Sequence, residues 1–267
     1  MNNNNPFFRF VQNLFGFTEG FQEATIIPKK IFQTWHSTNL PPKMRENIDS
    51  LKQKHPDFDY YLFDDDSCRR FIELNFEPSV VAAFDQLVPG AYKADLWRYC
   101  VLYIHGGIYM DIKFNTTPNV NLSQFLTREY FVRDLVNDNM QGVYNGFMVC
   151  KPKNPILLKC IKQIVEHVQN KFYGNTFLEI TGPHLLMKYF TKEEIDNMEL
   201  ALDVKVIGMH NIILDGLRSI LSTYPEYRNE QQKHQKNHYY TILWSEKQVY
   251  KFSPLTRTPF YQNSIIQ

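Results

Sequence analysis

Two adjacent glycines, Gly106 and Gly107, lie between a strongly helical segment and a segment with the pattern of a β-strand. The chain has 267 residues and only 11 glycines, and at no other position do two of them adjoin. Because glycine has no Cβ, such a pair permits a sharp reversal and a close approach to other backbone. We therefore expect the chain to turn here from a helix over 91–104 directly into a strand over 108–114.

Strand-like and helix-like segments alternate along the chain from residue 31 onward. Short apolar runs predict strands at 31–35, 58–63, 108–114, 146–150 and 204–207. Periodicity and capping residues predict helices at 44–54, 64–74, 79–87, 91–104, 156–172 and 184–190, and the segment 239–244 closes the pattern. This alternation is typical of an α/β domain in which helices cover a central sheet. No linker rich in glycine, serine or proline divides residues 26–267, so we expect a single domain there.

Residues 1–25 are expected to form an extension ahead of that domain. The run Asn2–Asn5 is of low complexity, and apolar side chains at i, i+3, i+4 and i+7 then predict a short amphipathic helix. These apolar positions are Phe7, Phe10, Val11 and Leu14. Because Arg9 is the single positive charge of this helix, we favour its packing on the domain over contact with a membrane surface.

The charge balance argues against polyanions as partners. Lys and Arg number 29 against 28 Asp and Glu, and a net charge of +1 provides no general attraction to nucleic acid or to an anionic membrane. The four cysteines form no C-x-x-C pair, and no apolar run approaches the roughly 20 residues of a membrane span. No cleavable signal segment is present. We therefore expect a protein of the cytoplasm, of a host cytoplasm or of a virion, with at most peripheral membrane contact.

Polar side chains on both sides of the glycine pair are expected to converge. Three of them share one helix face at i, i+3 and i+4, namely Asp95, Arg98 and Tyr99. Because side chains alternate in a strand, one face is apolar and buried (Ile108, Met110, Ile112) and the other is polar (Tyr109, Asp111, Lys113). The reversal at the glycines then brings the two polar faces into one cleft, at the carboxyl end of a strand, where α/β domains bind ligands.

Each of these charged pairs also has an ordinary structural interpretation. Asp95 and Arg98 can form an ion pair on a helix surface, and Asp111 and Lys113 can flank an exposed edge strand. The combination of both pairs with the rare glycine doublet favours a functional cleft.

The segment from Ala91 to Lys113 resembles the central motif of glycosyltransferase family 32, the DXD-motif sugar transferases. That motif runs A/S-D-x-x-R-Y-x-x-L-Y-x-x-G-G-x-Y-x-D-x-D, and it is matched here by Ala94-Asp95, Arg98-Tyr99, Leu102-Tyr103, Gly106-Gly107, Tyr109 and Asp111. The family's opening motif, I-P-K-x-I-H-Q-x-W, is similar to residues 27–35. Weaker matches lie at 145–148 and 181–184, so the resemblance covers about residues 26–190 in the family's order.

The resemblance implies an α/β fold of the GT-A type, a Rossmann-like nucleotide-sugar-binding domain with a mixed central sheet flanked by helices. It also implies transfer of a hexose from a nucleotide-diphosphate sugar to a hydroxyl of a glycan, polysaccharide or glycoprotein, with retention of the anomeric configuration. Family members usually bind the donor diphosphate through a divalent cation, Mn²⁺ or Mg²⁺. The compact length and the Asn-rich start suit a viral or bacterial member.

Residue by residue, we expect a catalytic group of Arg98, Asp111 and Lys113. Asp95 would accept hydrogen bonds from donor hydroxyls, and Trp35 would border the nucleotide base, although an ordinary core tryptophan is an equally good interpretation. The remaining substrate-binding candidates are Thr34, Gly107, Tyr109, Asn145 and His184. Tyr109 also fits a structural role in its strand, and His184 fits a helix cap.

The sequence departs from the family pattern at two positions. Phe32 stands where the family usually has histidine, and Lys113 stands at the second aspartate of D-x-D, which ligates the metal in the family. An ammonium group cannot coordinate a cation. One hypothesis is that Lys113 and Arg98 supply the positive charge themselves, and the alternative keeps a metal held by Asp111 and a late residue such as His238.

Two other classes of function compete with the transferase. A hydrolase would use Asp95 and Asp111 as acid and base, but nearby cations lower carboxylate pKa values, which suits binding better than proton donation. A catalytically silent module would keep the fold and bind nucleotide-sugar or glycan without turnover. The transferase ranks first because Asp95, Arg98, Tyr109 and Asp111 are all present.

Overall fold

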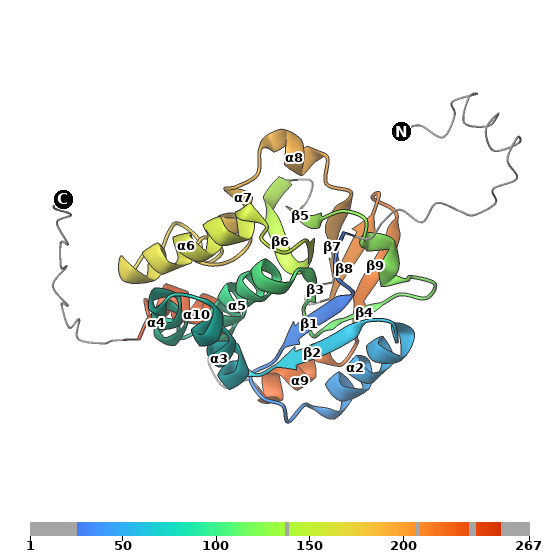
Figure 1. The fold of residues 1–267 in the computed structure, drawn as a ribbon, viewed down its shortest axis with the longest axis horizontal. Coiled ribbons are helices and arrows are strands. Elements are labelled where there is room, and N and C mark those ends of the chain that lie inside the picture. Colours follow the sequence, from blue (N-terminus) through green and yellow to red (C-terminus); the bar gives the residue numbers. More distant parts are fainter. Residues whose placement is uncertain (1–25, 137–138, 207–208, 235–238, 252–267) are drawn as a thin grey trace, which may run out of the picture.

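The computed structural model describes residues 26–136, 139–206, 209–234 and 239–251 (Figure 1). The predicted helix at residues 7–14 and the candidate ligand His238 lie outside these described residues.

One mixed β-sheet organises the described residues (Figure 1). Its strand order is β2-β1-β3-β6-β5-β7-β8-β9-β4. The strands are β1 (Lys30–Thr34), β2 (Asp59–Phe63), β3 (Gly107–Met110), β4 (Phe114–Thr116), β5 (Tyr130–Val136), β6 (Asn139–Cys150), β7 (Leu200–Val206), β8 (Met209–Leu214) and β9 (Arg218–Thr223). Strand β1 is parallel to β2 and to β3, and β5 is parallel to β7, whereas the other pairs are antiparallel.

Helices cover both faces of this sheet (Figure 1). They are α2 (Pro42–Lys54), α3 (Asp65–Asn75), α4 (Pro78–Gln86), α5 (Gly90–His105), α6 (Pro155–Gln169), α7 (Pro183–Met187), α8 (Lys192–Asp196), α9 (Tyr227–His234) and α10 (Tyr240–Ser245), with a 3₁₀ turn at Leu122–Phe125. The larger apolar core lies between the sheet and helices α3 to α7, and the second core lies under the 3₁₀ turn and α2 on the opposite face. The predicted α/β class, with a mixed central sheet flanked by helices, is confirmed.

The predicted reversal at the glycine pair is confirmed. Helix α5 ends at Gly106, whose φ is +62° and whose N–H donates to the carbonyl of Leu102. Gly107 follows with a φ of +105°, and a Cβ at this position would lie 2.7 Å from the carbonyl oxygen of Lys30. Both glycines are thus required, the first to end the helix and the second to let β3 lie beside β1.

Helix α5 differs from the expected two-sided helix because it is buried on almost all sides. Every side chain from Asp95 to Leu102 is less than a tenth exposed, including the polar triad Asp95, Arg98 and Tyr99. The polar face lies against a cavity rather than on the surface, so the interpretation of Asp95 and Arg98 as a helix-surface ion pair is wrong.

The predicted strand over 108–114 is wrong in its second half. Side chains alternate as expected in β3, where Ile108 and Met110 enter one core and Tyr109 the other, so that both faces are buried. The chain then turns, because the amide of Phe114 donates to the carbonyl of Asp111 and β4 pairs with β9 at the far edge of the sheet. Asp111 and Lys113 therefore lie in a turn between two distant strands and not along an edge strand.

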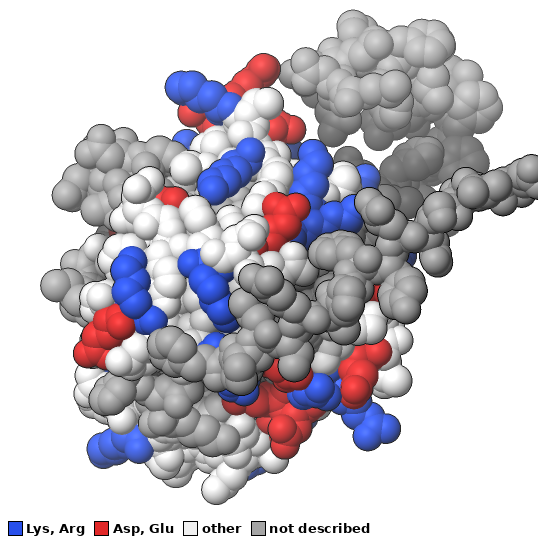
Figure 2. Space-filling view, turned by 90° about the vertical axis from the view of Figure 1, so that its left-hand side faces the viewer, with Lys and Arg blue, Asp and Glu red and all other residues white. Residues whose placement is uncertain are grey.

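Elements after residue 190 are less well predicted. The strand expected at 204–207 corresponds to β7, which begins four residues earlier, and the closing segment 239–244 corresponds to helix α10. Strands β8 and β9 and helices α8 and α9 were not anticipated, and neither was strand β5, which lies earlier in the chain. None of the described helices combines the length and the apolar character that a membrane span requires. On the face shown in Figure 2, the basic and acidic side chains of described residues are interspersed.

Candidate functional site

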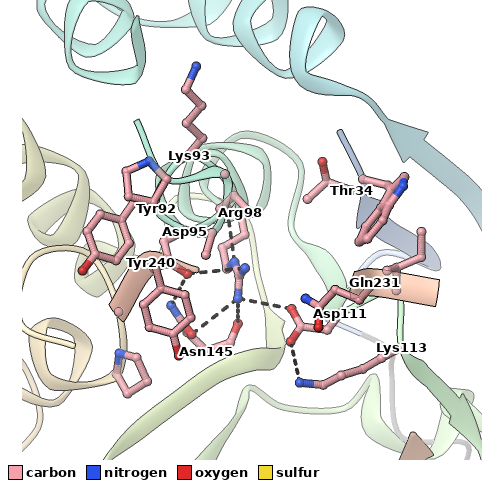
Figure 3. A pocket seen from close by; sticks show the side chains of 18 of the residues that line it. Thr34, Tyr92, Lys93, Asp95, Arg98, Asp111, Lys113, Asn145, Gln231 and Tyr240 are labelled. Carbon is pink, nitrogen blue, oxygen red and sulfur yellow. Dashed lines mark hydrogen bonds and ion pairs between the residues drawn. The ribbon is translucent and has the colours of Figure 1, made fainter. Parts of the chain in front are cut away.

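A cavity of about 520 Å³ opens where β1 and β3 end. Thr34 and Trp35 from the end of β1 line one side, and the turn after β3 contributes Asp111 and Lys113. Helix α5 supplies Asp95 and Arg98, β6 supplies Tyr144 and Asn145, and the C-terminal elements supply His210, Tyr227, Arg228, Gln231, Tyr239 and Tyr240. The predicted convergence of the helix and strand polar groups is therefore observed (Figure 3).

Arg98 lies at the centre of the charged network (Figure 3). Its Nη2 is 3.4 Å from Asp95 Oδ1, and its Nη1 is 3.4 Å from Asp111 Oδ1. The same Nη1 donates to the carbonyl of Asn145 at 2.9 Å, and the guanidinium lies over the ring of Tyr109, 4.4 Å from its centroid. With a side chain only 7% exposed, Arg98 fixes two carboxylates from different elements relative to each other.

Asp95 is held by donors from two other segments. Asn145 Nδ2 donates to its Oδ1 at 2.9 Å, and Thr181 Oγ1 donates to its Oδ2 at 2.7 Å. Asn145 Nδ2 also donates to the hydroxyl of Tyr99, which in turn donates to the carbonyl of Thr181. Burial raises the pKa of Asp95, against the charge of Arg98 and these hydrogen bonds. The network orients the carboxylate toward the cavity.

Asp111 is a carboxylate that stays ionised. Its Oδ1 accepts a hydrogen bond from Tyr109 and its Oδ2 accepts one from Tyr144, both at 3.0 Å. Burial alone would raise the pKa of Asp111, but the charges of Lys113 and Arg98 outweigh it and lower the pKa to about 2. The space for this carboxylate depends on Gly146, where a Cβ would lie 2.6 Å from Asp111 Oδ2.

Lys113 lies beside Asp111 and is almost completely buried. Its Nζ is 3.2 Å from Asp111 Oδ2 and 2.9 Å from His210 Nδ1. Burial lowers the pKa of His210 to about 3, with further contributions from the charges of Lys113 and Arg228. The imidazole is therefore neutral near pH 7, so its Nδ1 accepts a hydrogen bond from the Lys113 ammonium.

The backbone of the turn is anchored by amide side chains. Asn47 Nδ2 donates to the carbonyls of Ile112 and Phe114, each at 3.1 Å, and Gln33 Nε2 donates to the carbonyl of Asp111. On the other side, the amide of Tyr224 donates to the carbonyl of Lys113 at 3.0 Å. These contacts hold the turn on both sides, which favours a site that is formed before a ligand binds.

The neutral state of His210 has a consequence for stability at acidic pH. An unfolded chain protonates this histidine near pH 6.5, whereas the folded chain does so only near pH 3, so the unfolded state binds more protons between these values. The free energy of unfolding should therefore fall with acidification, by up to about 1.4 kcal/mol per pH unit from this group. This is measured by urea titrations at about pH 7, 6 and 5. Between about pH 6 and pH 5, the free energy of unfolding of the native chain should fall by about 1 kcal/mol more than that of the His210→Gln variant. Glutamine keeps a hydrogen-bond acceptor for Lys113. If the free energies of unfolding of the two proteins change with pH in parallel, the folded chain does not resist protonation of His210.

The described residues do not fit a divalent cation. Among residues 26–251, apart from the gaps given above, no three or more His, Cys, Asp or Glu side chains lie together as a ligand set. Both oxygens of Asp111 accept hydrogen bonds, and an ion bound there would face the fixed positive charges of Lys113 and Arg98. Asp111 as a metal ligand is therefore not supported by its surroundings.

Of the other predicted site residues, some line the cavity and others do not. Thr34 and Trp35 line the cavity, with the Thr34 hydroxyl donating to the carbonyl of Phe63. Gly107 and His184 do not line it, since Gly107 packs on the backbone of Lys30 and His184 Nδ1 lies 2.9 Å from the hydroxyl of Thr176. Their placement gives neither of them access to a ligand in this cavity.

Sequence reasoning missed the contributions of the C-terminal half. His210 on β8, Arg228 and Gln231 on α9, and Tyr240 on α10 all line the cavity. No local motif marks these residues, because they reach the site through the order of the strands. Tyr144 and Thr181 lie in or next to weakly matching segments, and their positions alone gave no sign of their hydrogen bonds to Asp111 and Asp95.

The segment that supplies this site also matches a family model. Residues 41–131 match the glycosyltransferase sugar-binding region containing the DXD motif. Over these residues the chain is similar to this glycosyltransferase family. The matched region includes helix α5, the glycine pair and the turn with Asp111 and Lys113.

Proteins similar to this chain occur in a yeast and in a giant virus. Inositol phosphoceramide mannosyltransferase 3 of Schizosaccharomyces pombe is 30% identical over 165 residues, which cover 61% of this chain and 45% of that protein. An uncharacterised glycosyltransferase of Acanthamoeba polyphaga mimivirus is 31% identical over 134 residues, covering 49% of this chain and 53% of that protein. The chain thus spans about half the length of these relatives. The solved structure of the PaToxG glycosyltransferase aligns with a TM-score of 0.47 and 18% identity, covering 61% of this chain and 68% of that one.

Proposed function

We propose that this chain transfers a hexose, with mannose as the first candidate, from a nucleoside-diphosphate sugar to a hydroxyl acceptor. The observation that carries the proposal is the buried network in which Arg98 links Asp95 to Asp111 at the wall of the cavity. The choice of mannose rests on the name of the S. pombe relative, a mannosyltransferase.

The geometry divides the cavity into parts with different chemistry (Figure 3). Trp35, which follows Thr34, offers an aromatic surface for a nucleotide base. Asp95 offers carboxylate oxygens for donor sugar hydroxyls, while Arg98 and Lys113 offer positive charge for the diphosphate. The ring of Tyr240 lies against those of Tyr92 and Phe177, and these three rings offer a surface suited to the faces of an acceptor sugar.

In the proposed reaction the bond between the anomeric carbon and the β-phosphate oxygen breaks, and its electron pair leaves with the nucleoside diphosphate. The acceptor hydroxyl oxygen forms the new bond to the anomeric carbon, and its proton passes to the departing phosphate oxygen. Because negative charge grows on that phosphate, fixed cations beside it lower the barrier. Front-side attack of this kind retains the anomeric configuration, and it suits a site whose carboxylates are already engaged by Arg98, tyrosines and amides.

The electrostatics support the transferase over a hydrolase. A general acid must carry a proton near pH 7, and the pKa of Asp111 is lowered to about 2. Asp95 accepts hydrogen bonds on both oxygens from Asn145 and Thr181, which favours its use as a fixed acceptor for hydroxyl groups.

A donor panel tests this proposal. The full chain is incubated with GDP-mannose, UDP-glucose, UDP-galactose and GDP-fucose, each with methyl α-mannoside or inositol, and free nucleotide and glycosylated product are measured. We expect one donor to give nucleotide release that increases with acceptor. The Asp196→Asn variant, which changes an exposed carboxylate on α8, should match the native chain. Thermal stabilisation by donors without nucleotide release would instead indicate a silent binding module. If donors cause neither stabilisation nor nucleotide release, both the transferase and the binding module are refuted.

A further inference from the structure

The turn after β3 places a buried ammonium group inside the cavity. Lys113 occupies the position at which the family pattern has its second aspartate, and its side chain is 8% exposed. The ammonium has three N–H donors, and in the described part of the chain its polar partners are Asp111 and His210. One N–H therefore remains for an oxygen of a ligand in the cavity.

Arg228 on α9 provides a second cation at this end of the cavity. Its Nη1 donates to the hydroxyl of Tyr239 at 2.6 Å and to Gln231 Oε1 at 2.8 Å. Arg228 is close enough to Lys113 to contribute to the lowering of its pKa, after the larger effect of burial. Lys113 is buried and Arg228 is partly buried, so two positive charges face the same part of the cavity and favour an anion there.

Helix α9 is fixed so that Arg228 stays over the cavity. The carboxylate of Glu230, on the same helix, accepts hydrogen bonds from the backbone amides of Lys43 and Met44 at the start of α2, at 2.8 and 2.9 Å. The hydroxyl of Tyr224 donates to the same carboxylate at 2.9 Å. Because these contacts tie α9 to α2, the two cations are arranged before a ligand arrives.

The carboxylates nearby do not remove this preference for an anion. Asp95 is paired with Arg98, and Asp111 lies within 3.4 Å of both Arg98 and Lys113. Asp134 also lines the cavity, and its burial raises its pKa, which weakens it as a counter-ion. His210 accepts a hydrogen bond from Lys113 while neutral, so it orients the ammonium without cancelling its charge.

We propose that Lys113, oriented by Asp111 and His210, and Arg228 bind the diphosphate of the donor directly, so that this chain binds nucleoside diphosphates without a divalent cation. The proposal rests on the proposed function for the identity of the ligand. In the family pattern a carboxylate at this position of D-x-D binds a metal ion. In this chain the Lys113 ammonium at the same position supplies the positive charge itself. His210 is a positioning residue in this arrangement, because it acts through Lys113.

Calorimetric titration of the full chain with GDP and with UDP, first in EDTA and then with Mn²⁺, tests whether the diphosphate binds without a metal ion. We expect one nucleotide to bind in EDTA, with a Kd that Mn²⁺ changes by less than about threefold. Lys113→Met should weaken binding about 10- to 100-fold in both conditions, as expected for loss of a charged hydrogen bond. Lys113→Arg keeps the charge and should retain metal-free binding within about tenfold. The matched control is Lys192→Met, which removes a charge from a side chain that is 87% exposed and should bind like the native chain.

The outcomes separate the two proposals. Binding that appears only with Mn²⁺, or unchanged binding by a folded Lys113→Met variant, would overturn the metal-free arrangement while leaving the transferase intact. Metal-free binding by a chain that transfers no sugar in the donor panel would support this inference and overturn the proposed function. Circular dichroism of each variant shows whether it is folded, and if Lys113→Met is unfolded, the comparison of the native chain in EDTA and in Mn²⁺ decides.

Discussion

Replacing Arg98 with leucine is expected to lower the free energy of unfolding by about 3–5 kcal/mol and to abolish sugar transfer. The guanidinium is the shared partner of Asp95 and Asp111, so its removal leaves the buried Asp95 without a counter-ion and leaves Asp111 with Lys113 alone. It also removes a donor to the Asn145 carbonyl and the cation over the Tyr109 ring. Urea unfolding followed by circular dichroism measures the first effect, and product formation with the active donor measures the second.

A conservative variant separates stability from function at this position. Arg98→Lys keeps the positive charge but cannot reach Asp95, Asp111 and the Asn145 carbonyl together. We expect it to recover most of the stability while transfer remains at least about 100-fold below the native rate. A lysine variant with native activity would show that Arg98 only neutralises charge.

Asp111→Asn is expected to have the second largest effect, because it removes the counter-ion of Lys113. The buried ammonium then has only the neutral His210 as partner, and the free energy of unfolding should fall by about 3 kcal/mol. Transfer should fall at least about 100-fold, since the hydroxyls of Tyr109 and Tyr144 also lose a charged acceptor.

A double-mutant cycle isolates the ion pair. Combining Asp111→Asn with Lys113→Met removes both charges, so the double variant should be more stable than Asp111→Asn alone, with a coupling of about 1–3 kcal/mol. Its activity should not recover, because the positive charge that faces the donor is gone. Additive stability losses in urea titrations would indicate that the two side chains do not interact.

The part of the site that the sequence predicts is the part encoded within one contiguous segment. Asp95 and Arg98 share a helix face by the period of the α-helix, and Gly106 and Gly107 set the reversal that follows. The shared helix face and the reversal each depend only on residues close together in the sequence, so they can be predicted without the order of the strands in the sheet.

What the sequence did not predict depends on contacts between distant segments. The strand pattern continues through Lys113, but the chain turns there because β4 pairs with β9, about a hundred residues later. The same long-range pairing brings β8 and α9 to the cavity, and with them His210 and Arg228. Alternation of polar and apolar residues carries no information about which strand becomes a neighbour.

The most direct test of the whole account is a crystal structure of the full chain with bound GDP or UDP, grown in EDTA. We expect the base to lie beside Trp35 and a phosphate oxygen to lie within hydrogen-bond distance, about 2.7–3.2 Å, of Lys113 Nζ. Arg228 should contact the same diphosphate, and Asp95 should remain open to the space where the sugar would lie. A nucleotide bound outside this cavity, or phosphates that contact neither Lys113 nor Arg228, would contradict the account.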